Sequence, residues 1–405
     1  MNSSDNSQIS KRILLVSLSP FLYGTGANSN FLTNFSIGVR LSGYFIELLI
    51  QDQSINDAGE FQGVQYKGCG GYRTRFKFIN SLSRIFANIF FPSYHLFKKK
   101  NSIDCVLAFQ NNFLYNVFLL ITCKLLSKPF IYIQVDHYNF ASYNTSRIGF
   151  RKRIKYLNYK LRYNFLSRYI SGAIVLSHFL KEHYLSLGIR EENIFLNPHL
   201  VNVDIFSEAL NTQIFTNETI SFGVLGSINQ RNGIVDLLIA FKFVTERYDK
   251  VELILIGGSE QEFDFCRKKS KELMIPDKIR YIAPVHYTKL PEVMKKCDAF
   301  VLPRPASIEA IAGFPTKVGE IMSCKRPIII TSFGDIPIYF EDKNNALLTN
   351  PGDPKSIASK MLYVIENQNE CLQIAQNGYN WIINTIEYKA AGKKIGEYLS
   401  KFIQN

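Results

Sequence analysis

The sequence predicts an α/β protein with two domains, each a parallel β-sheet covered by helices. Short apolar runs rich in β-branched residues alternate with helical segments along most of the chain, which is the pattern of parallel sheets. Glycines follow several of these runs, as at residues 24–26 and 226–233, and such strand, loop and helix units are typical of Rossmann-like domains. A chain of 405 residues is long for one such domain and suits two.

The first domain is expected to open with a buried strand at 12–18, a loop containing Gly24 and Gly26, and a helix over about residues 27–41. Ser29 stands where the dinucleotide-binding fingerprint has its third glycine, which argues against NAD. The remaining units of this domain are strands at 44–50, 105–109 and 130–135 and a strand and helix within 171–184.

Two polar residues, Asp136 and His137, follow the predicted strand at 130–135. Functional groups of parallel sheets gather at the carboxyl ends of strands. A carboxylate beside an imidazole can orient a hydroxyl group or take up its proton, so both residues are catalytic candidates. The alternative is a structural turn held by the same two side chains.

The second domain is predicted to begin after a polar segment at 207–218, with a strand at 220–225 and a helix from about Gly233 to Val244. Further strands are expected at 251–258, 279–285, 299–302 and 328–331. We therefore predict domains at 1–204 and 205–385, and a C-terminal helix within 386–405 that crosses back to the first domain.

The stretch from Ala299 to Ser332 predicts a ligand site. After the strand and a loop of small residues, a helix is expected from Thr316, its N-cap, to about Lys325. Lys317 in the first turn opposes the helix dipole, and an anion bound there would explain it, so we expect a phosphate site. Glu320 lies one turn deeper on the same face and can accept hydrogen bonds from a ribose. Together these groups indicate a nucleotide; the alternative is a packing helix with both side chains in solvent.

The residues GFPTKVGE, from Gly313 to Glu320, resemble the donor-site segment of family 4 glycosyltransferases with the GT-B fold. The resemblance implies two Rossmann-like domains that face each other across a cleft, with the nucleotide held mainly by the second. It also implies that Glu320 holds the ribose. The family's first glutamate falls on Ala312 here, which leaves Glu309, three residues earlier, as the candidate for contact with the donor sugar.

The sequence departs from this family at its phosphate-binding positions. The family's Arg and Lys beside the glycines matching Gly226 and Gly233 are replaced by Ser227 and Asn232, so nearby cations are the candidates for the donor phosphates. The donor-binding set implied by the resemblance and the local pattern is Gly24, Gly26, Asn28, Arg231, Asn232, Arg304, Gly313, Phe314, Pro315, Thr316, Lys317 and Glu320.

Positive charge is concentrated in the first half of the chain. Residues 1–204 hold 23 Lys and Arg against 11 Asp and Glu, whereas residues 205–405 hold 24 against 23. Between Glu60 and Glu182 the basic residues alternate with large apolar ones, which favours helices lying on an anionic membrane surface. A solvated basic face is the alternative, and nucleic acid is disfavoured because no nucleic-acid-binding motif accompanies the charge.

If the chain is active, the resemblance implies transfer of a hexose with retention from a nucleotide sugar, with a UDP-sugar as the expected donor. The charge suggests a glycan acceptor that is lipid-linked, as in the synthesis of cell-surface polysaccharide or glycolipid. No Asp-x-Asp metal motif follows a strand, so we expect a metal-independent reaction with the nucleotide sugar as co-substrate and no cofactor. The alternatives are a catalytically silent nucleotide-binding subunit and a nucleotide-sugar epimerase.

Location is predicted from cysteines and apolar runs. The seven cysteines show neither paired nor metal-ligand spacing, and the N-terminus is polar. The longest apolar run, residues 113–123, is too short to span a bilayer. We therefore expect a cytoplasmic protein at the inner face of the membrane.

Overall fold

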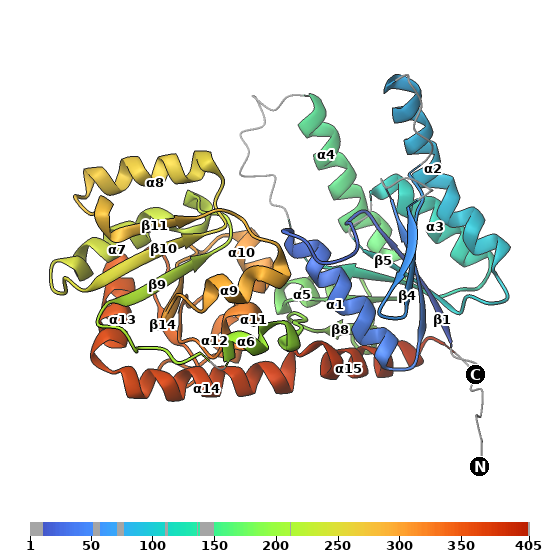
Figure 1. Ribbon diagram of the computed structural model, residues 1–405. Coiled ribbons are helices and arrows are strands. Elements are labelled where there is room, and N and C mark those ends of the chain that lie inside the picture. Colours follow the sequence, from blue (N-terminus) through green and yellow to red (C-terminus); the bar gives the residue numbers. More distant parts are fainter. Residues whose placement is uncertain are drawn as a thin grey trace, which may run out of the picture. The chain divides into compact units, whose positions relative to one another are not determined.

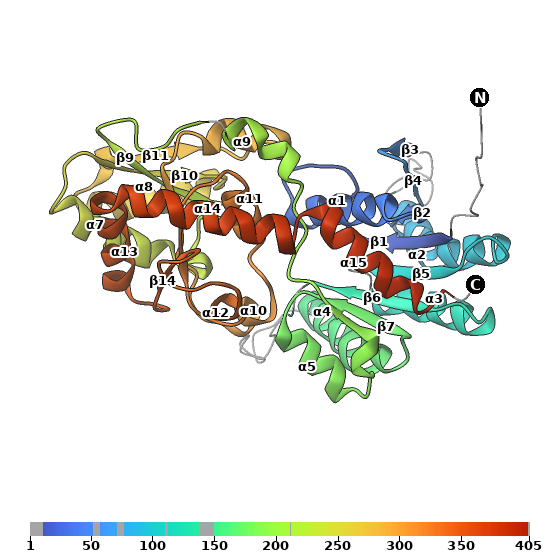
Figure 2. The same cartoon turned by 90° about the horizontal axis from the view of Figure 1, so that it is seen from below.

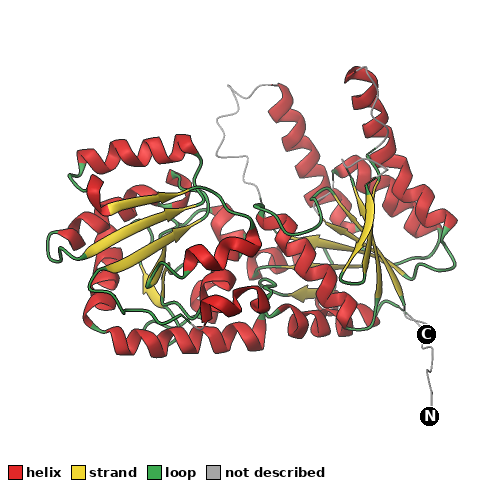
Figure 3. Cartoon of the chain, viewed as in Figure 1, coloured by secondary structure: helices red, strands yellow, loops and turns green. Residues whose placement is uncertain are grey.

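The computed structural model describes residues 11–51, 57–70, 77–109, 112–135, 137, 150–210 and 212–403. Asp136 lies outside these residues. The chain forms two compact units, and Figure 1 shows their elements. The first comprises residues 1–22, 28–198 and 388–405, and the second comprises residues 23–27 and 199–387, in each case as far as they are described. Both are α/β units, with helices packed around a sheet (Figure 3), as the sequence predicts.

The first unit has an eight-stranded sheet in the order β3-β4-β2-β1-β5-β6-β7-β8. All neighbouring strands are parallel except β3 and β4. The strands are β1 (Arg12–Ser17), β2 (Phe45–Ile50), β3 (Ala58–Phe61), β4 (Val64–Gly68), β5 (Cys105–Phe109), β6 (Phe130–Gln134), β7 (Gly172–Val175) and β8 (Ile194–Leu196). The helices are α1 (Ala27–Leu41), α2 (Lys77–Lys98), α3 (Phe113–Leu125), α4 (Phe150–Lys160), α5 (His178–Ser186) and α15 (Tyr388–Ser400).

The C-terminal helix α15 belongs to the first unit, where it lies beside α1 (Figure 2). The two helices meet at glycines. A Cβ added to Gly38 would lie 2.3 Å from the Tyr388 carbonyl oxygen, and one added to Gly392 would lie 2.3 Å from the Gly38 backbone. Any larger residue at either position would separate the helices.

The second unit has a six-stranded parallel sheet in the order β11-β10-β9-β12-β13-β14. Its strands are β9 (Ile220–Leu225), β10 (Val251–Ile256), β11 (Ile279–Ile282), β12 (Ala299–Leu302), β13 (Ile328–Thr331) and β14 (Leu347–Thr349). Its helices are α6 (Ser207–Leu210), α7 (Ile234–Thr245), α8 (Glu260–Glu272), α9 (Leu290–Met294), α10 (Ile308–Ala312), α11 (Thr316–Ser323), α12 (Ile336–Tyr339), α13 (Pro354–Glu366) and α14 (Gln368–Thr385).

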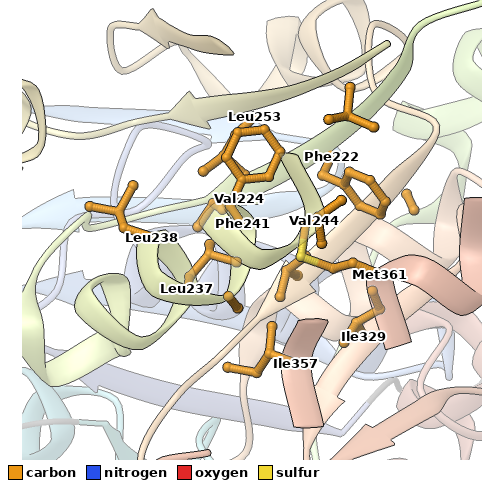
Figure 4. Close-up of a cluster of buried hydrophobic side chains, with 14 of the residues drawn as sticks. Phe222, Val224, Leu237, Leu238, Phe241, Val244, Leu253, Ile329, Ile357 and Met361 are labelled. Carbon is orange, nitrogen blue, oxygen red and sulfur yellow. The ribbon is translucent and has the colours of Figure 1, made fainter. Parts of the chain in front are cut away.

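The core of the second unit lies between this sheet and the helices α7 and α13. Phe222 of β9, Phe241 of α7 and Met361 of α13 are fully buried in it (Figure 4). Such burial fixes the strands, and with them the loops at their carboxyl ends. None of the described helices combines the length and the apolar content needed to cross a bilayer.

Candidate functional site

The strand order of the second sheet reverses direction between β9 and β12, which lie side by side. In open α/β sheets, ligands bind at the carboxyl edge beside such a reversal. The loop from Gly226 to Gly233 follows β9, and the loop that begins at Pro303 follows β12. The topology therefore places both loops at the position where this class of sheet binds its ligand.

Gly233 brings these two loops into contact. It adopts a left-handed conformation, with φ of +80°, and a Cβ added to it would lie 1.8 Å from the Pro303 carbonyl oxygen. Only glycine fits both the backbone angle and the close approach. As a result, Arg231, two residues before Gly233, lies near Arg304, which follows Pro303.

The two arginines form a cationic pair. The pKa of the half-buried Arg304 is lowered, first by burial and then by the charge of Arg231, while the carboxylate of Glu309 acts in the opposite direction. Two guanidinium groups held near one another repel each other unless an anion lies between them. Two nearby guanidinium groups suit the oxygens of a phosphate or diphosphate group, which arginine binds through paired hydrogen bonds.

Asn232 does not extend this cationic group. Its side-chain nitrogen donates to the backbone carbonyl of Ser227 over 2.8 Å. Ser227 and Asn232, which stand where the family has its Arg and Lys, are therefore joined by a hydrogen bond across the loop.

Helix α11 carries Lys317 and Glu320 on one face. The Lys317 ammonium lies 3.0 Å from Oε2 and 3.3 Å from Oε1 of Glu320. The Glu320 side chain is 3% exposed and the Lys317 side chain 26% exposed. A Cβ added to Gly226 would lie 3.3 Å from Lys317 Cε, so the lysine also lies over the end of β9. The two side chains contact each other, and the sequence analysis had assigned each of them to a ligand alone.

The N-terminus of α11 differs from the sequence prediction. Pro315, with φ of −69° and ψ of 108°, is the N-cap, and no side chain caps the helix there, so the prediction that Thr316 is the N-cap was wrong. The extended backbone that proline favours ends at Pro315, and Thr316 already has helical geometry. The helix also ends at Ser323 rather than Lys325, whose φ of +49° is incompatible with a helix.

The residue Phe314, just before α11, points into the core. The Phe314 side chain is buried among Tyr339, Phe340 and Trp381, with its ring centroid 6.2 Å from that of Trp381. Phe314 therefore anchors the loop from within the core, and Gly313 and Pro315 flank it. Ala312, at the family's first glutamate position, is fully buried.

Gly24 and Gly26 lie in a short segment that packs with the second unit. The Tyr23 ring stacks on the Tyr287 ring at 5.2 Å between centroids, and the Tyr23 carbonyl oxygen lies 2.8 Å from His286 Nε2. The Asn202 side chain donates to Tyr23 Oη over 3.1 Å. Asn28 belongs to the first unit, so the structure divides the predicted glycine-rich loop between the two units.

These contacts involve residues that the sequence analysis did not identify as functional. Tyr23, His286 and Tyr287 could have been identified only by their position after strands, since the residues that meet are more than 260 positions apart.

His199 is a further residue that sequence reasoning missed. It is buried, and its Cδ2 lies 3.4 Å from the position of a Cβ on Gly319 of α11. Burial and then the positive charge of Lys317 lower the pKa of His199 to about 3. This imidazole is therefore neutral near pH 7 and packs against the helix without competing with Lys317 for an anion.

His137 lies in the first unit, in an aromatic group. Its Nδ1 is 2.6 Å from Tyr159 Oη, and its ring contacts those of Tyr163 and Phe179, with centroids 4.7 and 5.6 Å away. The described residues contain no group of three or more His, Cys, Asp or Glu side chains arranged to hold a metal ion.

Comparisons with known proteins agree with this architecture. Residues 209–381 match the family model of the glycosyl transferases group 1. An uncharacterized glycosyltransferase, MJ1178 of Methanocaldococcus jannaschii, is 25% identical over 179 residues, which are 43% of this chain and 47% of that protein. The chain thus matches about half the length of this curated relative.

Solved structures match nearly the whole chain. Anabaena HepE in complex with UDP has a TM-score of 0.70 at 16% identity and covers 96% of this chain and 100% of its own. A glycosyltransferase from Rickettsia africae has a TM-score of 0.72 at 15% identity, and the match covers 98% of this chain and 99% of that chain. The class defined by two such Rossmann-like units is the GT-B fold, as the sequence predicts. The match to the glycosyl transferases group 1 model falls within the second unit.

Proposed function

We propose that the chain is a glycosyltransferase that moves a hexose from a nucleotide sugar to a glycan acceptor with retention of configuration. The observation that carries the proposal is the group of three cations and one buried carboxylate at the strand reversal of the second sheet. Arg231 and Arg304 lie near each other after β9 and β12, Lys317 lies over Gly226 at the end of β9, and Glu320 lies one helical turn deeper. This is the charge pattern that a nucleoside diphosphate requires.

The buried carboxylate of Glu320 is the group that we assign to the ribose. A carboxylate that is 3% exposed needs a partner, and in this structure the partner is Lys317. A bound ribose would offer two hydroxyl donors to Glu320, and the ammonium of Lys317 could then turn toward the phosphates. UDP is the proposed nucleotide because HepE, with which this chain shares its fold, was solved in complex with UDP.

Departure of the diphosphate is the step that these cations would assist. Negative charge develops on the leaving oxygen, and fixed cations and the uncapped N-terminus of α11 stabilise it. We therefore propose catalysis that uses neither a cofactor nor a metal ion. His137, Asp136 and Glu309 remain the candidates that contact the reacting sugar or the acceptor hydroxyl.

The proposed acceptor is lipid-linked, because the first unit exposes an apolar surface. On α2, Phe86, Phe90, Tyr94 and Phe97 recur at helical spacing and are 48–58% exposed. On α3, Leu114, Phe118, Ile121 and Leu125 form a second exposed row, and the rings of Phe90 and Phe118 join the rows at 5.2 Å between centroids. We call these eight residues the apolar stripe.

Lysines border the apolar stripe. Lys98 lies over the Tyr94 ring at 5.1 Å and Lys100 over the Phe97 ring at 5.4 Å. An apolar row flanked by cations is the arrangement that binds an anionic membrane at its interface. We propose that this face holds the enzyme at the inner surface of the membrane, where it would act in the synthesis of a cell-surface polysaccharide or glycolipid.

Release of nucleoside diphosphate tests the proposed reaction. The chain is incubated with UDP-glucose, UDP-galactose and UDP-N-acetylglucosamine, with and without anionic vesicles that carry a membrane lipid extract. We expect UDP release from one donor, faster with vesicles, and a product whose anomeric configuration in NMR matches that of the donor. Inversion of configuration would overturn the retaining mechanism, and the absence of UDP release under every condition would overturn the activity.

A catalytically silent nucleotide-binding subunit is the second candidate. The hydrogen bond from Asn232 to the Ser227 carbonyl favours this candidate, because these two residues stand where the family has its basic pair. This candidate predicts nucleotide binding without UDP release.

A further inference from the structure

We infer that Tyr159 is a positioning residue for His137, and that it keeps the histidine in the neutral form with its proton on Nε2. The inference rests on the proposed function, because it concerns how a candidate catalytic imidazole is held. It assigns His137 one of two roles that the sequence leaves open: a donor that orients a hydroxyl group, as opposed to a base that takes up its proton.

The contact that carries the inference is the 2.6 Å separation between Tyr159 Oη and His137 Nδ1. A neutral imidazole has one donor and one acceptor nitrogen, and the hydrogen bond made by one nitrogen decides which carries the proton. A phenol can donate or accept, and in the arrangement that we infer Tyr159 donates its proton to Nδ1. The ring proton of His137 then resides on Nε2, and that nitrogen is a hydrogen-bond donor.

The phenol of Tyr159 is held rigidly. Its side chain is 9% exposed, its ring stacks on Tyr163 at 5.3 Å between centroids, and the Arg162 guanidinium lies over it at 5.3 Å. The chain leaves α4 here through a π-helical turn, Leu161–Phe165. Such turns are uncommon and often occur at functional sites. A donor fixed in this way can hold the imidazole in one orientation.

The histidine that packs on the far side of Tyr163, His183, is neutral near pH 7. The His183 ring stacks on Tyr163 at 3.5 Å, and its Nε2 lies 3.1 Å from the Tyr163 carbonyl oxygen. Burial lowers the pKa of His183 to about 4, and proximity to His137 acts in the same direction. Among the contacts that the structure describes, the charged group beside the pair is Arg162, whose guanidinium lies over the Tyr159 ring.

The structure also provides a matched control. Tyr163 belongs to the same stack, yet its hydroxyl has no hydrogen-bond partner among the residues that the structure describes. Tyr163→Phe removes a hydroxyl from the same stack without touching Nδ1 of His137, whereas Tyr159→Phe removes the donor.

The test is ¹⁵N NMR of the full chain with labelled histidine. The sequence contains six histidines, and His137→Gln identifies the signal of interest. We expect His137 to be neutral and protonated on Nε2 in the unmutated protein and in Tyr163→Phe, and to lose this preference in Tyr159→Phe. A proton on Nδ1 in the unmutated protein, or the same tautomer in all three proteins, would overturn the inference.

Turnover provides a second readout. With the donor sugar that is active, we expect Tyr159→Phe to lower kcat by on the order of tenfold or more while leaving the affinity for UDP unchanged. Tyr163→Phe should change kcat less than twofold, and equal losses in both variants would contradict a positioning role. If the unmutated chain binds UDP but releases none from any donor, the proposed activity fails, whereas the NMR result still decides the role of Tyr159.

Discussion

Lys317 Nζ lies 3.0 Å from Glu320 Oε2 across one turn of α11, with the carboxylate almost completely buried. Without a nucleotide, each charge therefore neutralises the other. The pair also explains how a carboxylate can be kept buried and ready for a ribose, since an unpaired buried charge would cost several kcal/mol or would take up a proton. Nucleotide binding would exchange this ion pair for two new contacts, one with the ribose and one with the phosphates.

A double-mutant cycle on this pair tests its contribution to stability. Lys317→Met leaves Glu320 buried without its cation, and we expect a loss of roughly 1.5–3 kcal/mol in the free energy of unfolding. Glu320→Gln in the same chain should restore part of the loss. The measurement is urea unfolding followed by the fluorescence of Trp381, the one tryptophan, which lies in the same unit. Additive effects of the two substitutions would show that the pair contributes nothing.

Arg231 and Arg304 are expected to bind phosphate rather than base or ribose. Arg231→Gln or Arg304→Gln should weaken UDP binding by about tenfold, consistent with loss of a charged hydrogen bond. UMP, which lacks the second phosphate, should lose less affinity, and the dependence of UDP affinity on salt should flatten. The control is Arg280→Gln, because Arg280 pairs with Glu252 near the start of the strands. Equal losses of affinity for UMP and UDP would show that the arginines do not bind the second phosphate.

Serine substitutions at Phe90 and Phe97 test the apolar stripe. Each removes a side chain that is about half exposed, so the fold should be unchanged. We expect the double variant to lose most of its flotation with anionic vesicles, because apolar burial in the interface is lost while the charge is retained. Phe265→Ser, on α8 of the second unit, is the matched control, with 37% exposure. Undiminished flotation of the double variant would show that charge alone binds the membrane.

Glu47 of the first unit makes stability depend on pH. Burial raises the pKa of this carboxyl, but hydrogen bonds from His95 and Lys99 outweigh burial and bring the pKa down to about 2. Because the folded pKa is below the usual value of 4.5, the carboxylate stabilises the fold above pH 4.5, and this contribution is lost as the pH falls toward 2. Near pH 7 the ionised Glu47 contributes roughly 3 kcal/mol to the free energy of unfolding.

Glu47→Gln should therefore destabilise the first unit at pH 7, and the difference from the unmutated chain should shrink between pH 4.5 and 2. Circular dichroism during urea unfolding measures this difference in the free energy of unfolding. Glu191→Gln, which removes an exposed carboxylate paired with Lys181, should have no measurable effect. A difference for Glu47→Gln that is the same at pH 3 and pH 7 would contradict the pKa assignment.

The sequence was sufficient to predict both parallel sheets, because their strands are short apolar runs separated by helical segments. It did not predict β3, β4, β8 or β14, and the reason is physical. The residues of β3 are mostly exposed and polar or small, so they lack the apolar run that marks the central strands. Edge strands of this kind are stabilised by pairing with a neighbouring strand, and the local sequence pattern carries no information about that pairing.

The candidate site was predictable in part. The spacing of Lys317 and Glu320 places them on one helix face, and the sequence analysis used that face to predict a ligand. It did not anticipate that the two side chains pair with each other, although i,i+3 spacing allows it. The proximity of Arg231 to Arg304 depends on Gly233 packing against Pro303, and this tertiary packing has no local signature in the sequence.

Calorimetric titration of UDP, GDP and ADP into the unmutated chain and into Glu320→Gln tests the central claim most directly. The experiment uses low salt and no added metal, with Glu252→Gln, a part-buried carboxylate at the start of β10, as the control. We expect UDP to bind, GDP and ADP to bind more weakly, and Glu320→Gln alone to lose roughly 1.5–3 kcal/mol of binding free energy. Absence of binding by all three nucleotides, or UDP binding that does not depend on Glu320, would contradict a donor site at this edge of the sheet.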